Sequence, residues 1–338
     1  MRKLFIVITL ALVASSFLLQ SDTISAPSNG SNGRTHKLSI VDNFFHVTSA
    51  GNNFYISGPD GELLKLDESR KFITRKIDTL QDLLSISFID DKNGWVVGTS
   101  GVAFKTNDGG KSWVPLNLEF GKGKGKIKGK VSFTCVEADS KNRVVIAGEA
   151  GVVGYSVDGG LNFKEISIPE DINIACVKIT NDGLLVGGEF GVLYSYRGGK
   201  WHKVEMTSGI FTGEDWMNPE VISGILSIDD KQFAIIGFTG NTYTYNLKDN
   251  KIKKTATLSA PLYSISKSKE NYVACGEYGK LFYSSDLVNW KDSKKDVSSN
   301  VYLRSVNFSK HSNTGVAIGG YGTVFITQDG GLNWQILK

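Results

Sequence analysis

The segment from Leu83 to Leu116 reads LLSISFIDDKNGWVVGTSGVAFKTNDGGKSWVPL and decides the fold. It contains four strand-length pieces, LLSISFID, GWVVG, VAFKT and SWVPL, and turn residues separate each piece from the next. Four strands joined by short turns predict a small antiparallel sheet with two apolar faces. A single sheet of this size cannot bury both faces by itself, so we expect it to pack against copies of itself.

The spacing of glycines reveals these copies. A G-x-x-G element follows a short apolar stretch seven times, with successive spacings of 40, 50, 40, 49, 39 and 43 residues. The elements are Gly58–Gly61, Gly98–Gly101, Gly148–Gly151, Gly188–Gly191, Gly237–Gly240, Gly276–Gly279 and Gly319–Gly322. A repeat of about 40 residues with four strands is typical of a propeller blade. We therefore predict an all-β fold, a seven-bladed β-propeller of four-stranded antiparallel blades, over residues 44–338.

The first strand of most repeats carries a small residue at one matching position. These residues are Ser85, Cys135, Cys176, Gly224, Ser264 and Ser305. The inner strands of a propeller converge near its axis, where the least room is available for side chains. This crowding explains why small residues recur at this position. Matched positions of neighbouring blades lie too far apart for a disulfide, so we expect the three cysteines of the chain to be free and buried. No pair of histidines lies near them, and we predict neither a metal site nor a cofactor.

The N-terminus has the pattern of a secretory signal. Arg2 and Lys3 precede an apolar run from Leu4 to Ala14, which is shorter than the roughly 20 apolar residues of a spanning helix. We predict a signal peptide at 1–25 and a linker at 26–43, with an uncleaved anchor as the alternative. No cysteine lies near this segment, so a lipid-attachment signal is missing. The expected product is an exported monomer, periplasmic or at the cell surface, with no stable membrane span after cleavage.

The positive charge is concentrated in one stretch. The formal net charge is +4, and removing 1–25 takes away Arg2, Lys3 and Asp22 to leave +3. The stretch GKGKGKIKGK at 121–130 alone carries five lysines, without which the remainder would stand at −2. The charge therefore gives no support to a general nucleic-acid-binding surface. The lysine stretch is either a solvated insertion or a capture site for an anionic polymer.

The most specific motif lies between the third and fourth strands and has the form [S/T]-x-D-G-G-x-x-[W/F]. Full copies span Thr106–Trp113, Ser156–Phe163 and Thr327–Trp334, and degenerate copies span Ser195–Trp201 and Ser284–Trp290. The aspartate can accept hydrogen bonds from backbone N–H groups, the glycines allow positive φ, and the aromatic ring anchors the hairpin. The predicted structural residues are Asp108, Trp113, Asp158, Phe163, Asp286, Trp290, Asp329 and Trp334.

These turns carry a family resemblance. They are the turns of the Asp-box, or BNR, repeat, and together with the preceding G-x-x-G they resemble most closely the photosystem II stability and assembly factor group of propellers. The resemblance covers roughly Phe44 to the C-terminus. It implies a propeller with a chaperone-like docking surface. Asp-box turns also occur in sialidases, xyloglucanases and sortilin-type receptors, so they predict the fold more sharply than the function.

A binding site is expected on the face that holds the second-to-third strand turns and the connections between blades. The candidate residues there are Glu149, Glu189, Phe190, Phe211, Trp216, Phe238, Glu277, Tyr278 and Tyr321. Aromatic rings beside carboxylates can bind a sugar or a peptide segment. The alternative is structural: the glutamates serve as turn residues, and the aromatic rings pack against adjacent blades.

Enzymatic function has weaker support in the sequence. No arginine lies in the Arg-Ile-Pro-type context of a sialidase, and the four histidines are scattered without a neighbouring nucleophile. A glycosidase needs two carboxylates about 5–10 Å apart, for which Glu149 with Glu189, or Glu214 with Asp215, are formal candidates only. We therefore favour a non-catalytic scaffold for an unknown protein or glycan, with a carbohydrate-active enzyme as the alternative.

Overall fold

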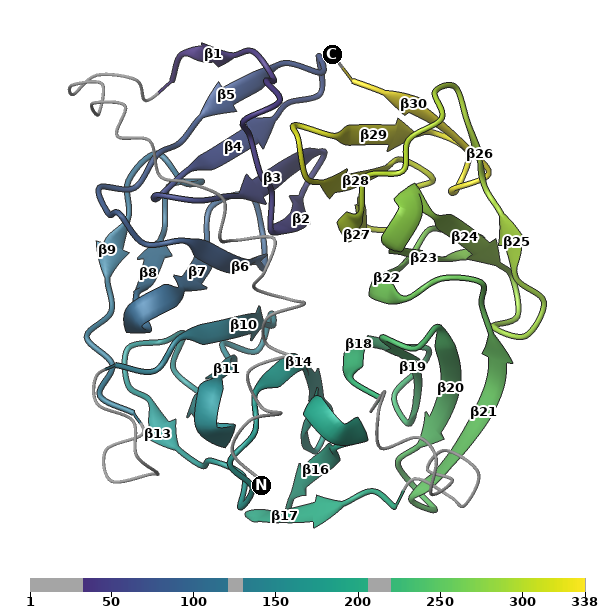
Figure 1. Ribbon diagram of the computed structural model, residues 1–338. Helices are drawn as coiled ribbons and strands as arrows, with labels where there is room; N and C mark the ends of the chain where they lie inside the picture. The colour runs from purple at the N-terminus through teal and green to yellow at the C-terminus, as the bar shows by residue number, and fades with distance from the viewer. Residues whose placement is uncertain (1–32, 121–129, 206–219, 338) are drawn as a thin grey trace, which may run out of the picture. The chain divides into compact units, whose positions relative to one another are not determined.

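The computed structural model of the chain describes residues 33–120, 130–205 and 220–337. These residues form seven sheets whose strands lie side by side within each sheet (Figure 1). The predicted signal peptide, Phe211, Trp216 and nearly all of the lysine stretch lie outside the described residues. Within the described ranges, no helix is long and apolar enough to cross a membrane.

The sheets follow one another along the chain as blades 1 to 7. Blade 1 contains β1 (Thr35–His36), β2 (His46–Ala50), β3 (Asn53–Ser57), β4 (Leu63–Leu66) and β5 (Phe72–Thr74). Blade 2 contains β6 (Leu83–Phe88), β7 (Gly94–Gly98), β8 (Ala103–Thr106) and β9 (Val114–Pro115). Blade 3 contains β10 (Phe133–Ala138), β11 (Val144–Gly148), β12 (Val153–Ser156) and β13 (Lys164–Glu165). Blade 4 contains β14 (Ile174–Thr180), β15 (Gly183–Gly188), β16 (Leu193–Arg197) and β17 (Lys200–Lys203).

The remaining blades repeat this order. Blade 5 contains β18 (Ile222–Ser227), β19 (Gln232–Gly237), β20 (Asn241–Asn246) and β21 (Lys251–Thr257). Blade 6 contains β22 (Leu262–Lys267), β23 (Tyr272–Gly276), β24 (Leu281–Ser284) and β25 (Lys291–Asp292). Blade 7 contains β27 (Leu303–Phe308), β28 (Gly315–Gly319), β29 (Val324–Thr327) and β30 (Asn333–Ile336), with β26 (Lys294–Lys295) added in parallel to β30.

The first strands of the blades form a closed ring. Each contacts the first strand of the next blade, and β27 of blade 7 contacts β2 of blade 1. One buried apolar cluster joins these two blades, with Phe44 and Ile56 on one side and Ile318 and Val324 on the other. Figure 1 shows the same order, with β2, β6, β10, β14, β18, β22 and β27 facing the centre. The predicted seven-bladed propeller is confirmed.

Blade 1 begins earlier than the sequence predicted. Thr35 and His36, inside the predicted linker, pair with Ile73 and Phe72 of β5 and form the outer strand of the blade. Leu38 then packs against the apolar cluster shared by blades 1 and 7. Part of the segment before Phe44 is therefore integrated into the fold.

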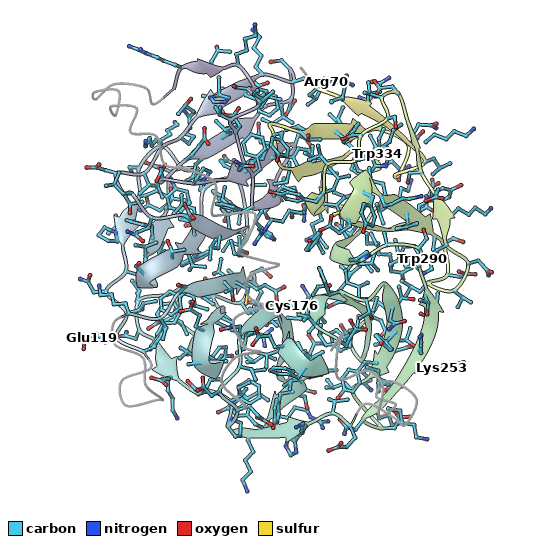
Figure 2. All side chains as sticks on the ribbon, in the orientation of Figure 1. Arg70, Glu119, Cys176, Lys253, Trp290 and Trp334 are labelled. Atoms are coloured by element: carbon cyan, nitrogen blue, oxygen red, sulfur yellow. The ribbon has the colours of Figure 1, made fainter. Side chains whose placement is uncertain are left out.

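Serine hydroxyls link the inner strands. In each case the serine Oγ accepts a hydrogen bond from a backbone N–H of the next blade. The bonds join Ser85 to Val136 (3.2 Å), Ser264 to Val306 (3.3 Å) and Ser305 to Val47 (3.2 Å). The last bond closes the ring. The serines among the small residues of the inner strands thus supply hydrogen bonds in addition to fitting a narrow space. Cys176 occupies the matching position of blade 4, and Figure 2 shows it on the inner side of the ring.

The three cysteines are free and buried, as expected. Burial raises the pKa of the Cys135 thiol to about 12, and it also raises the pKa of Cys275. Their thiols are therefore protonated near neutral pH and unreactive as nucleophiles.

Candidate functional site

The seven G-x-x-G turns lie at one face of the ring, which we call the turn face. Six of them share a backbone form in which the third residue and the following glycine both have positive φ, the pattern of a type I′ hairpin. In blade 2 these residues are Ser100 and Gly101, and Val102 N–H donates to the Thr99 oxygen at 3.2 Å. The third residue therefore occupies the tip of the turn.

The residues at these tips divide the turn face into two parts. Blades 1 to 3 carry Asp60, Ser100 and Ala150 at the tips. Blades 4, 6 and 7 carry Phe190, Tyr278 and Tyr321, whose exposed fractions are 53%, 59% and 65%. Bulky side chains rarely adopt positive φ, so these three rings are held in a costly backbone conformation and still point into solvent.

Blade 5 completes the series with a different turn. Its ring, Phe238, is partly buried and packs against Tyr263 with centroids 5.6 Å apart. Tyr263 in turn contacts Tyr302 edge to face at 6.4 Å. We call the six rings on blades 4 to 7 the aromatic arc; they are Phe190, Phe238, Tyr263, Tyr278, Tyr302 and Tyr321.

The predicted glutamates have structural hydrogen bonds. Glu149 Oε2 accepts from the Ser132 backbone N–H at 2.7 Å, just before β10. Glu189 accepts from the backbone N–H of Asn173 at 2.9 Å and from its amide at 3.0 Å, just before β14. Both carboxylates therefore tie the entry of an inner strand to the turn of the same blade. The third glutamate, Glu277, accepts a hydrogen bond from the Tyr263 hydroxyl and fixes that ring in the arc.

Sequence reasoning missed a fourth structural carboxylate, Glu220. Its side chain is 3% exposed, and it accepts hydrogen bonds from Thr239 N–H at 3.0 Å, Asn241 Nδ2 at 3.0 Å and the Tyr243 hydroxyl at 3.1 Å. Burial, followed by the charge of Glu220, raises the pKa of Tyr243. Neutral donors thus satisfy this buried charge, and it stabilises the turn of blade 5.

Arg304 is the second residue that the sequence did not single out. It occupies a β-bulge of β27, between Leu303 and Ser305. Its guanidinium carbon lies 5.3 Å from the centre of the Phe45 ring, and it makes no hydrogen bond or ion pair with any residue that the structure describes. Burial lowers the pKa of the Arg304 guanidinium. Electrostatic interactions with Tyr302, Tyr263 and Asp82 raise it and oppose part of that effect.

The neighbours of Arg304 place it near the axis on the turn face. Phe45 belongs to blade 1, Asp82 precedes blade 2, Tyr263 is in blade 6 and Tyr302 precedes blade 7. Only a side chain close to the centre of the ring can interact with residues of four blades at once. The bulge positions of the other inner strands hold Leu84, Thr134, Ala175, Ser223 and Tyr263. Arg304 is the only charged residue in this series of described bulges, and this is a weak signal in the sequence.

His46 adds no positive charge beside Arg304. Burial, partly opposed by a hydrogen bond with the Ile86 backbone, lowers the pKa of the His46 imidazole to about 4. The ring is therefore neutral near pH 7. A guanidinium with free donors, surrounded by aromatic rings, is suited to bind a carboxylate in a bidentate manner.

The opposite face holds the Asp-box turns, and these stabilise the ring. Asp108 Oδ1 accepts from the backbone N–H groups of Lys111 and Ser112, both at 3.0 Å. Asp158, Asp286 and Asp329 make equivalent bonds. The Tyr55 hydroxyl of blade 1 donates to the Gly109 oxygen of blade 2 at 3.1 Å.

The aromatic residues of these turns are largely covered. Trp334 is 1% exposed and its indole N–H donates to the Gly331 oxygen at 3.0 Å. The rings of Trp113 and Phe88 meet edge to face at 6.1 Å, and the rings of Phe163 and Phe120 do so at 6.2 Å. Trp290 N–H donates to the Leu287 oxygen at 3.1 Å. Each ring thus anchors a turn, and this face presents no comparable set of aromatic tips among the described residues.

Known proteins share this architecture. The family described as photosynthesis system II assembly factor YCF48 matches residues 64–338. A solved structure titled "YCF48 bound to D1 peptide" is 16% identical, with a TM-score of 0.66, and the match covers 91% of this chain and 99% of that chain. YCF48 from Cyanidioschyzon merolae is 17% identical with a TM-score of 0.64, covering 88% and 99%. A GH74 enzyme of Niastella koreensis has a TM-score of 0.67 at 12% identity, covering 90% of this chain and 55% of the enzyme.

Curated relatives agree over shorter stretches. The photosystem II assembly lipoprotein Ycf48 of Prochlorococcus marinus is 36% identical over 67 residues, which is 20% of this chain and 18% of the relative. The protein of the same name from Synechococcus is 26% identical over 127 residues, or 32% and 36%. The chain thus spans between about a fifth and about a third of these curated relatives. Since the family match extends over most of the sequence, the chain belongs to the photosynthesis system II assembly factor YCF48 family.

Proposed function

We propose that the chain is an exported, non-catalytic assembly scaffold that binds an extended segment of a partner protein on the turn face, across the aromatic arc. The observation that carries this proposal is the exposure of Phe190, Tyr278 and Tyr321 at strained turn tips. Large exposed rings are enriched at protein interfaces, because each buries a large apolar area at low entropic cost.

Arg304 supports the same location. A partly buried guanidinium that forms no ion pair with the described residues is stabilised when a ligand brings a negative charge to it. Rings on blades 4 to 7 beside such a group favour a peptide that presents apolar side chains and one carboxylate.

The kind of partner follows from the family. One structural relative is described as YCF48 bound to a D1 peptide, so a protein segment is a better candidate than a glycan. We therefore propose a photosystem II subunit, with a D1 peptide as the first to test. The name lipoprotein in the curated relatives is consistent with export, which the N-terminal pattern of this chain also predicts.

The glycoside hydrolase alternative is not favoured. One of its formal acid pairs, Glu149 and Glu189, is occupied by hydrogen bonds to the backbone before β10 and β14. The other pair, Glu214 and Asp215, lies outside the described residues. The likeness to the GH74 enzyme is a likeness of fold at 12% identity.

Binding of a fluorescent D1 peptide tests the proposal. Replacing Phe190, Tyr278 and Tyr321 together by serine should weaken binding at least about tenfold, because three anchoring rings are lost. Fluorescence anisotropy measures the affinity, and circular dichroism verifies the fold. Failure of the natural chain to bind would contradict a D1-type partner.

The matched control changes three exposed apolar residues on the opposite face. Val157, Leu161 and Val288 are 66%, 75% and 52% exposed in Asp-box turns. Their replacement by serine should leave the affinity unchanged. An equal loss in both variants would show that the binding surface is not the turn face.

A further inference from the structure

A cluster of three metal-ligating side chains lies on blade 1, away from the aromatic arc. His36 comes from β1, Asp42 from the segment before β2, and Glu62 from the turn immediately before β4. One donor atom from each, an imidazole nitrogen and two carboxylate oxygens, lies within 4.8 Å of the other two. We propose that these residues bind a divalent transition-metal ion, which fastens the segment between β1 and β2 to blade 1.

The donor atoms are already close to the arrangement that such an ion requires. His36 Nε2 and Asp42 Oδ2 are 3.0 Å apart. Two donors on a tetrahedral zinc ion at about 2.0–2.1 Å lie about 3.3 Å from one another. The Glu62 carboxylate sits farther away, but three side-chain bonds can rotate to bring it in.

Asp42 is oriented by its surroundings. Its Oδ2 accepts a hydrogen bond from Ser39 N–H at 2.8 Å, in addition to the contact with His36. The side chain is 9% exposed, and Oδ1 has no hydrogen-bond donor among the residues described. A fixed ligand with a free oxygen loses little entropy when it binds a metal ion.

Of the three side chains in the cluster, Glu62 has the carboxylate with no partner in the described part of the chain, so a cation would stabilise it most. Its side chain is partly buried, and the carboxylate makes no hydrogen bond or ion pair with the residues that the structure describes. Burial, and then the negative charge of Asp42, raises the pKa of the Glu62 carboxyl. The attraction of His36 and, after it, that of Lys76 act in the opposite direction and are smaller. A divalent ion would neutralise both carboxylates at once.

The donor set selects the class of metal. One imidazole with two carboxylates suits zinc and similar transition-metal ions, whereas magnesium prefers oxygen ligands alone and retains its waters. The sequence predicted no metal site, because these residues match no spaced ligand motif and meet only after β1 joins β5.

The location assigns a role to the ion. Between His36 and Asp42 the chain passes over the junction of blades 1 and 7, where Leu38 packs on their shared cluster. The backbone carbonyl oxygen of Asp42 accepts a hydrogen bond from Gly322 N–H of blade 7 at 2.7 Å. A metal ion that joins both ends of this segment to Glu62 would therefore hold it against the closure point of the ring.

Titration of the full chain with zinc chloride, after treatment with a chelator, tests the proposal. Isothermal titration calorimetry should show one zinc ion per chain. Glu62→Gln and His36→Asn should each weaken the affinity at least about tenfold. Glu68→Gln, which changes an exposed carboxylate outside the cluster, is the matched control and should bind as the natural chain does. Magnesium chloride in excess should not compete.

Hydrogen exchange provides a second readout that does not depend on affinity. Zinc should slow amide exchange over 34–43 in the natural chain and not in Glu62→Gln. Absence of stoichiometric zinc binding would overturn the proposal. So would unchanged binding in both ligand variants, since the ion would then be held elsewhere on the chain, for example by an exposed histidine.

Discussion

At the scale of single residues, the structure separates stabilising carboxylates from candidate binding groups. Asp108 and its counterparts accept backbone hydrogen bonds on one face, and Glu149 and Glu189 do so on the other. Glu149 and Glu189, which the sequence analysis placed in a binding site, therefore have a structural role as acceptors of backbone hydrogen bonds. Arg304 has none, and it stands out as the polar residue whose surroundings call for a ligand.

Asp108→Ala should lower the free energy of unfolding by about 1–2 kcal/mol, as loss of a capping side chain does. The substitution removes the acceptor for Lys111 N–H, for Ser112 N–H and for the Ser112 hydroxyl at 2.6 Å. Urea unfolding measures the change. The exposed Asp78, which makes no hydrogen bond within the described part of the chain, is the control, and Asp78→Ala should have no comparable effect.

The contribution of Asp108 should also depend on pH. Slight burial alone would raise its pKa, but hydrogen bonds from Ser112 and Thr106 lower it to about 2. The unfolded value is about 3.9. The stabilisation is therefore complete above about pH 5 and disappears as the pH falls from about 4 towards 2. The difference in stability between the natural chain and Asp108→Asn should shrink over that interval; a constant difference would contradict the assignment.

Arg304→Gln should separate stability from binding. Removal of a partly buried positive charge that forms no ion pair with the described residues should leave the free energy of unfolding little changed, because the interactions lost are a cation–π contact with Phe45 and the electrostatic attraction of Asp82. Affinity for the D1 peptide should fall about tenfold, the usual effect of losing one charge-assisted hydrogen bond. A strongly destabilised variant with unchanged affinity would assign Arg304 a structural role.

At the scale of strands and turns, the repeat predicts most of the fold. The first two expected strands of the segment Leu83–Leu116, LLSISFID and GWVVG, match β6 and β7, because glycine turns recur at a nearly fixed spacing and limit each strand. The bulges of the inner strands were not predictable. A bulge adds one residue to one strand of a pair, and the sequence contains no separate signal for it.

Close packing against the backbone requires the first glycine of five of the turns, which is Gly98, Gly148, Gly188, Gly276 or Gly319. A Cβ added at Gly98 would lie 1.8 Å from the Asp82 oxygen. Gly98→Ala should therefore cost about 3 kcal/mol or more of unfolding free energy, since the entry of β6 must move. Gly198→Ala is the control: nothing lies within 4 Å of its Cβ, and only its φ of 56° opposes alanine. We expect a loss of about 1 kcal/mol there, and equal losses would refute the steric explanation.

At the scale of the whole molecule, function depends on which residues meet when the ring closes. Arg304, Phe45, Asp82 and Tyr263 are distant in sequence and come together because four blades converge near the axis. The same holds for His36 and Glu62 on blade 1. The position of Tyr278 at an exposed turn tip was predictable from the sequence of the turn alone. The residues around Arg304 and the pair of His36 and Glu62 meet only in the folded chain, so their proximity depends on the order of the blades and on the angle between them.

Site-specific photo-crosslinking in cells shows whether the partner binds on only one part of the turn face, at blades 4 to 7. A photoreactive residue is placed in turn at Asp60, Ser100, Ala150, Phe190, Tyr278 and Tyr321, and at Leu161 on the opposite face. A partner that binds on blades 4 to 7 should form adducts at Phe190, Tyr278 and Tyr321, and none at Ser100, Ala150 or Leu161. Adducts of equal yield around the ring, or adducts confined to blades 2 and 3 or to Leu161, would contradict it.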